Sequence, residues 1–232
     1  MPQLPPPKRH PYDQWSPDAR ALDLVGDKWT LLIIRDLASG PRRFVQLQRV
    51  LPGISTEQLR SRLNRMVADG LLTRTRYREV PPRVDYELTA SARDLMPVLG
   101  ALARWGHRWA WSPPRGGELV DIGAILRLAP GLVRPGEQPA VLQCTVTDGL
   151  RDGGPLTATV TLGQGTARVA EAPADAPDAR ITGSTQAWVA ALGPERSAGA
   201  LTIDGDRELA VGVITQLAGA VIPGAGIEPA VP

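Results

Sequence analysis

The chain has 232 residues, more than the roughly 100 to 150 of the commonest single domain, so we expect two modest domains. No apolar run approaches the roughly 18 residues that span a bilayer, and the proline-rich start lacks an apolar signal segment, so we expect a soluble, cytoplasmic protein with no membrane partner. Residues 1–115 hold 19 Lys and Arg against 11 Asp and Glu, whereas residues 116–232 hold 7 against 13, which suggests a polyanionic partner for the first half unless surface charge simply varies between domains.

Three short helices are predicted before residue 52. Ser16 and Pro17 form an N-cap and first-turn pair, and Gly26 ends the helix that they begin. The segment DKWTLLIIRDLASGP places apolar residues at helical spacing before a Gly-Pro pair, which is typical of a core helix. A third helix is predicted in FVQLQRV, where Pro52 follows closely.

The fourth helix lies in ISTEQLRSRLNRMVADG and begins at a capping box of Ser55 and Gln58. With about 100° of turn per residue, one quadrant of this helix is apolar and the opposite side is polar. The apolar quadrant holds Leu59, Leu63, Met66 and Val67, and the opposite side holds Gln58, Ser61, Asn64 and Arg65, with Arg60 and Arg62 on the flanks. Such amide, hydroxyl and guanidinium groups can bond base edges and phosphates in a DNA major groove, although a solvated arginine face is an equally good interpretation.

The following segment, LLTRTRYREVPPRVDYELT, predicts two strands around a Pro-Pro tip. Arginines lie on one side of the first strand, and Arg83 follows the tip. Three helices and a hairpin with a basic rim make up a winged helix-turn-helix. An arginine at a hairpin tip can enter a minor groove, but the hairpin could also serve only to cover the core.

The stretch from Ser16 to Gly106 closely resembles the HxlR-type winged-helix transcriptional regulators, relatives of the MarR type. Its most specific pieces are GDKWTLLIIRDL, GPRRFVQLQRVLPGIS, LRSRLNRMVADGLL and EVPPRVDYELT, in the order and spacing of that family. The resemblance implies a homodimer that binds double-stranded operator DNA. The helix from Ser55 to Asp69 would be the recognition helix, and the hairpin around Pro81 and Pro82 would be the wing.

Ten DNA-binding residues follow from this interpretation. Phosphates are expected to contact Lys28, Arg42, Arg43 and Arg83. Bases are expected to contact Thr56, Gln58, Ser61, Arg62 and Arg65, and Ser55 is the DNA-binding residue at the helix start. Many family members have a cysteine just before the first helix, where this chain has Ser16, so we do not expect redox sensing at that position.

The segment SARDLMPVLGALARWGHRWAW repeats apolar residues in a stripe wider than a two-layer core needs. We expect this stripe to pair with its twin in a dimer, which would separate two recognition helices by about one duplex turn, ~34 Å. The competing interpretation is that its tryptophans pack inside the chain, under the second domain. The stripe consists of Leu95, Val98, Leu99, Leu102, Trp105 and Trp109.

A Pro- and Gly-rich connector, SPPRGGE, predicts a boundary that divides the chain into residues 1–115 and 116–232. Beyond it, AVLQCTVTDG and LTATVTLGQG alternate as strands do, and each of the segments PDARITGSTQAWVAALG and LTIDGDRELAVGVITQL predicts a strand, a turn and a helix. The predicted fold class is therefore α+β, with a winged helix-turn-helix domain followed by an α/β domain.

Residues from about Ala140 to Leu217 resemble the sterol-carrier-protein-like fold. The resemblance implies an open sheet covered by helices, with an apolar cavity for a hydrophobic small molecule. Candidate lining residues are Trp188, Val189, Leu192, Val213, Ile214 and Leu217. Apolar residues at helical spacing also form ordinary cores, so core packing remains the alternative.

Nothing in the sequence indicates catalysis. Cys144 is the single cysteine, the two histidines lie far apart, and no phosphate loop or Ser/His/Asp arrangement is present, so we expect no enzyme activity, metal or cofactor. The sequence predicts a dimeric DNA-binding regulator whose second domain binds a hydrophobic effector or supports assembly. The rival hypothesis is a lipid or hydrophobic-ligand carrier whose first half serves only as a dimerisation module.

Overall fold

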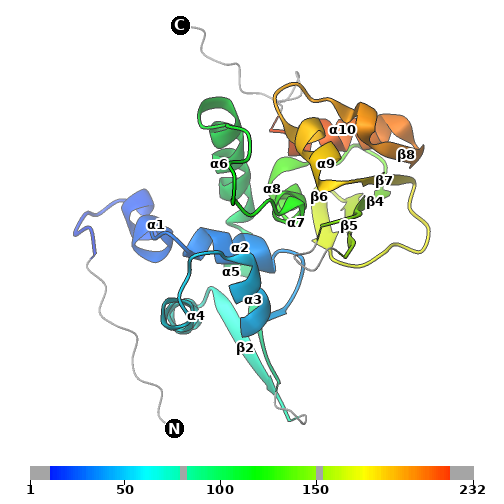
Figure 1. Ribbon diagram of the computed structural model, residues 1–232. Helices are drawn as coiled ribbons and strands as arrows, with labels where there is room; N and C mark the ends of the chain where they lie inside the picture. Colours follow the sequence, from blue (N-terminus) through cyan, green and yellow to red (C-terminus); the bar gives the residue numbers. More distant parts are fainter. Residues whose placement is uncertain (1–10, 79–82, 150–153, 220–232) are drawn as a thin grey trace, which may run out of the picture. The chain divides into compact units, whose positions relative to one another are not determined.

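The computed structural model describes residues 11–78, 83–149 and 154–219 (Figure 1). The chain divides into two compact units, residues 1–99 and 100–232, each with its own sheet. The predicted wing tip at Pro81 and Pro82 lies outside the described residues. Within the described ranges, no helix combines the length and the apolar character needed to span a membrane.

The first unit opens with four helices that confirm the predicted ones. They are α1 (Pro17–Val25), α2 (Thr30–Leu37), α3 (Phe44–Val50) and α4 (Thr56–Ala68). The Ser16 hydroxyl accepts the Ala19 N–H at 3.2 Å, as expected of an N-cap. The capping box of α4 is also present, since Ser55 Oγ accepts the Gln58 N–H and Gln58 Oε1 accepts the Ser55 N–H, both at 3.1 Å.

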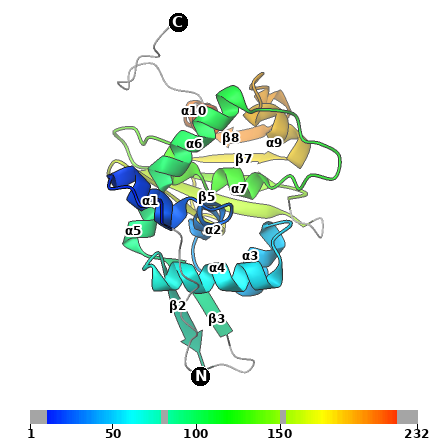
Figure 2. The ribbon, with the colours of Figure 1, turned by 90° about the vertical axis from the view of Figure 1, so that its left-hand side faces the viewer.

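A small sheet follows the helices. Strands β2 (Leu72–Tyr77) and β3 (Arg83–Leu88) form the predicted antiparallel hairpin, and β1 (Arg42–Arg43) pairs with β3 on its other side. Helix α4 lies beside this hairpin, with α3 as its other neighbour, and the short α5 (Ala90–Arg93) follows β3 (Figure 2). Neither β1 nor α5 was predicted, because elements of two and four residues are too short to show a periodic pattern.

The core of the first unit lies between α2, α3, α4 and the sheet. Its buried side chains are Ile33, Ile34, Leu37, Leu47, Leu51, Leu59, Leu63, Met66, Leu71, Leu72 and Leu88. Three members of the predicted apolar quadrant of α4 are fully buried, and the fourth, Val67, is half-buried. Full burial of such a side chain contributes roughly 1.5 to 3 kcal/mol, so this stripe holds α4 to the unit and leaves its opposite face to solvent.

Helix α6 (Met96–Trp109) contains the division between the two units, which falls at Leu99 and Gly100. Most of α6 belongs to the second unit because it packs on the segment around Gly131. Arg104 Nη1 donates to the Gly131 carbonyl at 3.3 Å, and a Cβ added at Gly100 would lie 2.0 Å from that same oxygen. Only glycine therefore fits at position 100. The SPPRGGE segment, which was predicted to separate the two domains, is a loop within the second unit.

The second unit is built on a five-stranded sheet of order β6-β5-β4-β7-β8. Its elements are α7 (Ile122–Leu126), α8 (Ala129–Leu132), β4 (Ala140–Val146), β5 (Leu156–Gly163), β6 (Thr166–Ala170), β7 (Ala179–Gly183), α9 (Thr185–Leu192), a 3-10 turn (Ala198–Ala200), β8 (Thr202–Gly205) and α10 (Arg207–Leu217). Neighbouring strands are antiparallel except β4 and β7, which are parallel. The predicted strands, α9 and α10 are confirmed, whereas α7 and α8 were not predicted.

The two faces of this sheet differ in character. Alternate residues such as Leu142, Val160 and Ile181 are buried on the face that α7, α8, α9 and α10 cover (Figure 1). The other face carries threonine and glutamine side chains, and the connection from β6 to β7 crosses it. Thr159 Oγ1 donates to the Ala172 carbonyl at 2.7 Å, and Gln143 Oε1 accepts the Ala174 N–H at 3.0 Å.

Candidate nucleic-acid interface

The recognition helix predicted from the sequence presents a polar face. Thr56, Glu57, Gln58, Arg60 and Asn64 are exposed on α4, whereas Ser61, Arg62 and Arg65 are half-buried. Two of the exposed residues also have structural contacts. Gln58 Oε1 belongs to the capping box, and Thr56 Oγ1 accepts a hydrogen bond from Gln48 Nε2 at 2.8 Å. The Gln58 amide NH2 and the Thr56 hydroxyl proton remain able to donate to a base edge or a phosphate.

Arg62 and Arg65 lie on the flank of α4 that faces α1. They line a hollow of about 280 Å³ together with Tyr12, Leu22, Asp23, Gly26 and Asp27. Arg62 Nη1 lies 2.9 Å from Asp27 Oδ2, so the structure gives this predicted base contact a partner within the protein. In the described part of the chain, the Arg65 guanidinium has no hydrogen bond or ion pair. Base contacts by both arginines remain predictions.

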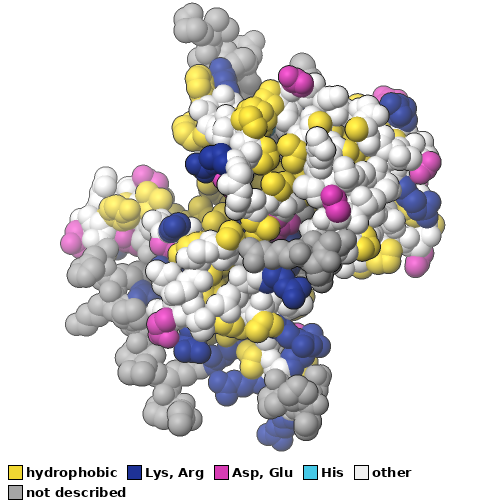
Figure 3. All heavy atoms as spheres, in the orientation of Figure 1, with side chains coloured by type: hydrophobic (Ala, Val, Ile, Leu, Met, Phe, Trp, Pro, Cys, Tyr) yellow, Lys and Arg dark blue, Asp and Glu magenta, His cyan; other side chains and the backbone are white. Residues whose placement is uncertain are grey.

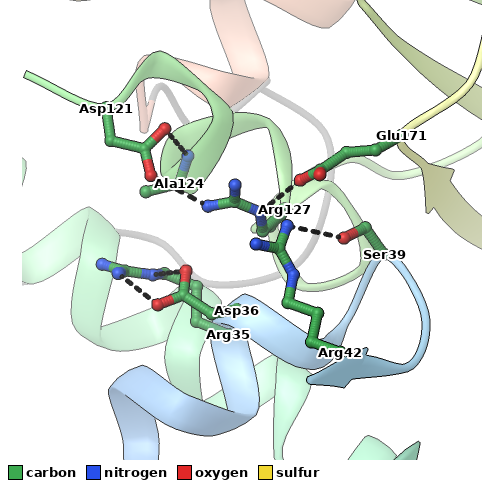
Figure 4. A network of polar contacts seen from close by, with 8 residues as sticks. All are labelled: Arg35, Asp36, Ser39, Arg42, Asp121, Ala124, Arg127 and Glu171. Carbon is green, nitrogen blue, oxygen red and sulfur yellow. Dashed lines mark hydrogen bonds and ion pairs between the residues drawn. The ribbon is translucent and has the colours of Figure 1, made fainter. Parts of the chain in front are cut away.

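The four predicted phosphate contacts differ in accessibility. Lys28 is exposed, with Nζ 4.8 Å from the ring centroid of Trp29. The Arg43 side chain is 52% exposed, with Nε 4.0 Å from Asp85 Oδ1. Arg42 is only 8% exposed, and its Nη2 donates to Ser39 Oγ at 3.4 Å (Figure 4). Lys28 and Arg43 are therefore open to a phosphate as they stand, whereas Arg42 would have to change its position.

Arg83, the fourth, begins strand β3 beside the undescribed tip. Its Nε donates to both carboxylate oxygens of Asp85 at 2.9 Å, and its guanidinium lies 5.2 Å from the ring centroid of Tyr77. The hydrogen bonds from Arg83, helped by the positive charges of Arg83 and Arg43, hold the pKa of Asp85 below its ordinary value. The side chain of Arg83 is 38% exposed, so it keeps a solvent-facing edge while it bonds to Asp85.

Three arginines of the hairpin complete the basic surface, although the predicted site did not include them. Arg76 and Arg78 are exposed, and no ion pair within the described ranges involves them. Arg74 Nη1 donates to Asn64 Oδ1 at 3.4 Å, so it connects the hairpin to α4. Lys and Arg side chains gather over this end of the first unit (Figure 3). The period-two spacing of these three arginines in the sequence already places them on one side of the first predicted strand, and this signal was sufficient to add them to the site.

The six candidate ligand-pocket residues of the second unit lie on α9 and α10. Trp188, Leu192, Val213, Ile214 and Leu217 are buried, and Val189 is half-buried. The Trp188 indole Nε1 donates to the Thr145 carbonyl at 3.1 Å, which attaches α9 to β4. Core packing and pocket lining both require burial, so the predicted cavity stays a prediction.

Two groups of the second unit, the Arg127 guanidinium and the Cys144 thiol, are buried. Arg127 is 2% exposed, and its ion pairs to Asp121 and Glu171 measure 3.1 and 2.7 Å (Figure 4). Cys144 is buried in β4, and burial raises the pKa of its thiol to about 12. This thiol is therefore protonated at neutral pH.

Comparison with known proteins places similarity in the first part of the chain. Residues 24–113 match the model of the HxlR-like helix-turn-helix family. The uncharacterized HTH-type transcriptional regulator sll1512 of Synechocystis is 43% identical over 93 residues, which cover 40% of this chain and 69% of that protein. The corresponding regulator YkvN of Bacillus subtilis is 36% identical over 88 residues, which cover 38% of this chain and 75% of that protein.

Among solved structures, the redox regulator HypR in its reduced form is 34% identical. The similarity covers 40% of this chain and 92% of HypR, with a TM-score of 0.39.

Proposed function

The chain belongs to the HxlR-like helix-turn-helix family, and on this premise we propose that it is a sequence-specific transcriptional regulator and not an enzyme. The observation that supports this most directly is the position of the polar face of α4 beside a hairpin with exposed Arg76 and Arg78. A helix of this kind suits a major groove, and a basic hairpin suits the adjacent backbone and minor groove. We also expect the protein to be cytoplasmic.

The proposed contacts divide into two classes. The phosphate contacts are Lys28, Arg43, Arg76 and Arg78. Arg83, which keeps a solvent-facing edge, and Arg42, which would have to rearrange, are further candidates. The base contacts are Thr56, Gln58, Ser61 and Arg65, and Ser55 is a further DNA contact at the start of the helix. Arg62, also predicted as a base contact, is paired with Asp27. Phosphate contacts supply affinity and fix orientation, whereas base contacts supply sequence preference.

A salt titration of DNA binding tests this proposal. We expect the logarithm of the association constant to fall linearly with the logarithm of the salt concentration, with a slope of about −0.9 for each phosphate contacted. Replacing Arg76 and Arg78 by Ala together would flatten the slope by about 1.8 and weaken binding to every duplex equally. No preference for duplex DNA, together with uptake of a hydrophobic ligand, would contradict the proposal and favour the carrier hypothesis.

We further propose that the protein is a homodimer and that α6 forms its interface. Val98, Leu102, Trp105 and Trp109 form an exposed stripe on α6, with exposed fractions of 50, 51, 57 and 65%. An exposed apolar stripe of this size is typical of an interaction surface. DNA binding and dimerisation would then both lie within residues 1–115, although most of α6 packs in the second compact unit. Sedimentation measurements should show that Leu102→Glu is monomeric, whereas Val211→Glu, at an exposed apolar position on α10, should remain dimeric.

The second unit, which we propose is sterol-carrier-protein-like, would bind a hydrophobic effector between its helices and its sheet. Support comes from the order of its elements, with three antiparallel strands, a crossover to the parallel strand β7, and then α9, β8 and α10. Mass spectrometry of small molecules that copurify with the protein tests this. A bound effector should change DNA affinity by a coupling of about 1 to 3 kcal/mol, and no change with any copurified molecule would contradict effector control.

A further inference from the structure

Asp27 connects the start of α2 to the middle of the recognition helix. Its Oδ1 accepts the N–H groups of Trp29 and Thr30 at 2.8 and 3.1 Å, and its Oδ2 accepts the Thr30 hydroxyl and Arg62 Nη1. The Arg62 and Asp27 side chains are 30 and 24% exposed, so the pair is partly shielded from solvent. The Asp27 carboxylate thus accepts hydrogen bonds from free N–H groups at the start of α2 and also pairs with the Arg62 guanidinium of α4.

The position of Arg62 on the flank of α4 lets this ion pair restrict rotation of the helix about its axis. The buried stripe of Leu59, Leu63 and Met66 decides which face of α4 points outward. On α4, Arg62 and Thr56 lie about 60° to either side of the stripe centred near Leu59. Arg62 pairs with Asp27 on one flank, and Thr56 bonds to Gln48 on the other. Polar contacts on both flanks limit the smaller rotations of α4 about its axis, which change the angle at which its outward side chains meet a partner.

Resting on the DNA-binding function proposed above, we propose that Arg62 is a positioning residue whose ion pair with Asp27 fixes the rotation of α4, and that Arg62 does not contact DNA. The residue that this arrangement presents is Arg65, one turn further along the same flank, whose guanidinium has no protein partner within the described ranges. Loss of the pair lets α4 rotate, so Arg65 and Ser61 meet their bases at the wrong angle.

Two substitutions separate this role from direct contact, because the two roles predict opposite changes in DNA affinity for Asp27→Asn. Asp27→Asn keeps an amide oxygen for the Trp29 and Thr30 N–H groups but removes the charge that holds Arg62. If Arg62 positions α4, both Asp27→Asn and Arg62→Met lower affinity for a selected duplex by about tenfold, and the double variant is no weaker than either. If Arg62 contacts DNA, Asp27→Asn instead raises affinity, since it frees the guanidinium and removes a carboxylate near the phosphates.

The salt slope provides the second readout. A positioning residue leaves the slope unchanged when it is replaced, whereas loss of a phosphate contact flattens it by about 0.9. The matched controls are Arg93→Met and Glu87→Gln, which break an exposed ion pair of the same length, 2.9 Å, elsewhere in the first unit. We expect these controls to bind as the wild type does. A flattened slope in Arg62→Met, or tighter binding by Asp27→Asn, would overturn the proposal.

The full-length chain should be used throughout, with a duplex selected by the wild-type protein from a randomised library. Thermal melting confirms that each variant is folded, and if Asp27→Asn does not fold, Arg62→Met carries the test because it leaves the start of α2 intact. Hydrogen exchange of the α4 amides needs no DNA and should become faster in both variants. Failure of the wild type to select any duplex would refute the proposed function, and unchanged α4 exchange would separately refute the positioning role.

Discussion

The two units contain helices whose surfaces differ: α4 of the first unit has one apolar and one polar face, whereas α9 of the second unit is mostly apolar. In the first unit, α4 buries Leu59, Leu63 and Met66 and turns polar side chains outward. In the second, α9 buries Trp188 and Leu192, and most of its other residues are also apolar. A function carried by exposed side chains can be inferred from the pattern that distinguishes the two faces of a helix. A function carried by buried side chains leaves no such contrast, because core and cavity need the same residues.

The largest expected effect is on the stability of the second unit, at Trp188, which either fills its core or lines a cavity. Trp188→Ala removes a fully buried side chain and its hydrogen bond to Thr145, so we expect a loss of about 3 to 5 kcal/mol in the unfolding free energy. DNA affinity should not change while the protein is folded. Denaturant titration measures the loss, and a destabilisation below about 1 kcal/mol would show that Trp188 lines a space instead of filling a core.

The next largest effect is expected on DNA binding, at Arg65 on α4. Arg65→Ala should cost about 1 to 3 kcal/mol of binding free energy and relax the sequence preference if the guanidinium makes a bidentate base contact. Binding measured across a set of duplex variants, with and without the substitution, checks this. An equal loss on every duplex would reassign Arg65 to the DNA backbone.

Asp85 makes the stability of the first unit depend on pH. Its pKa is held low by Arg83, so its carboxylate stabilises the hairpin above the ordinary aspartate pKa of about 3.9, and this stability is lost as the pH falls through the lowered native value. Asp85→Asn should destabilise the first unit by on the order of 1 kcal/mol at pH 7 and remove that part of its acid sensitivity. Unfolding measured from pH 7 to about pH 3 would contradict this if wild type and variant ran parallel.

The smallest effect is expected at Cys144. With a pKa of about 12 and a buried side chain, the thiol should not react with a thiol reagent in the folded protein at pH 8, and DNA binding should be unaffected. The same reagent should modify the thiol fully in denaturant. Fast labelling of the native chain would show that the second unit opens readily.

The sequence predicted most of the fold because its signals are local. The caps at Ser16 and Ser55, the stripe of α4 and the alternation in β4 and β5 each lie within one element. Contacts between distant segments left no such pattern. The Asp27–Arg62 pair, the Arg74–Asn64 bond and the packing of Gly100 against Gly131 depend on tertiary structure. For this reason the polar face of α4 was predicted, but the partner of Arg62 was not.

Selection of duplexes from a randomised library by the full-length protein tests the central claim most directly. We expect enrichment of one sequence, recovered as an inverted repeat with half-sites about one duplex turn apart, and loss of that enrichment when Ser61 and Arg65 are replaced by Ala. Recovery of no preferred sequence, or of the same sequence by that double variant, would contradict the claim that the outward face of α4 reads DNA.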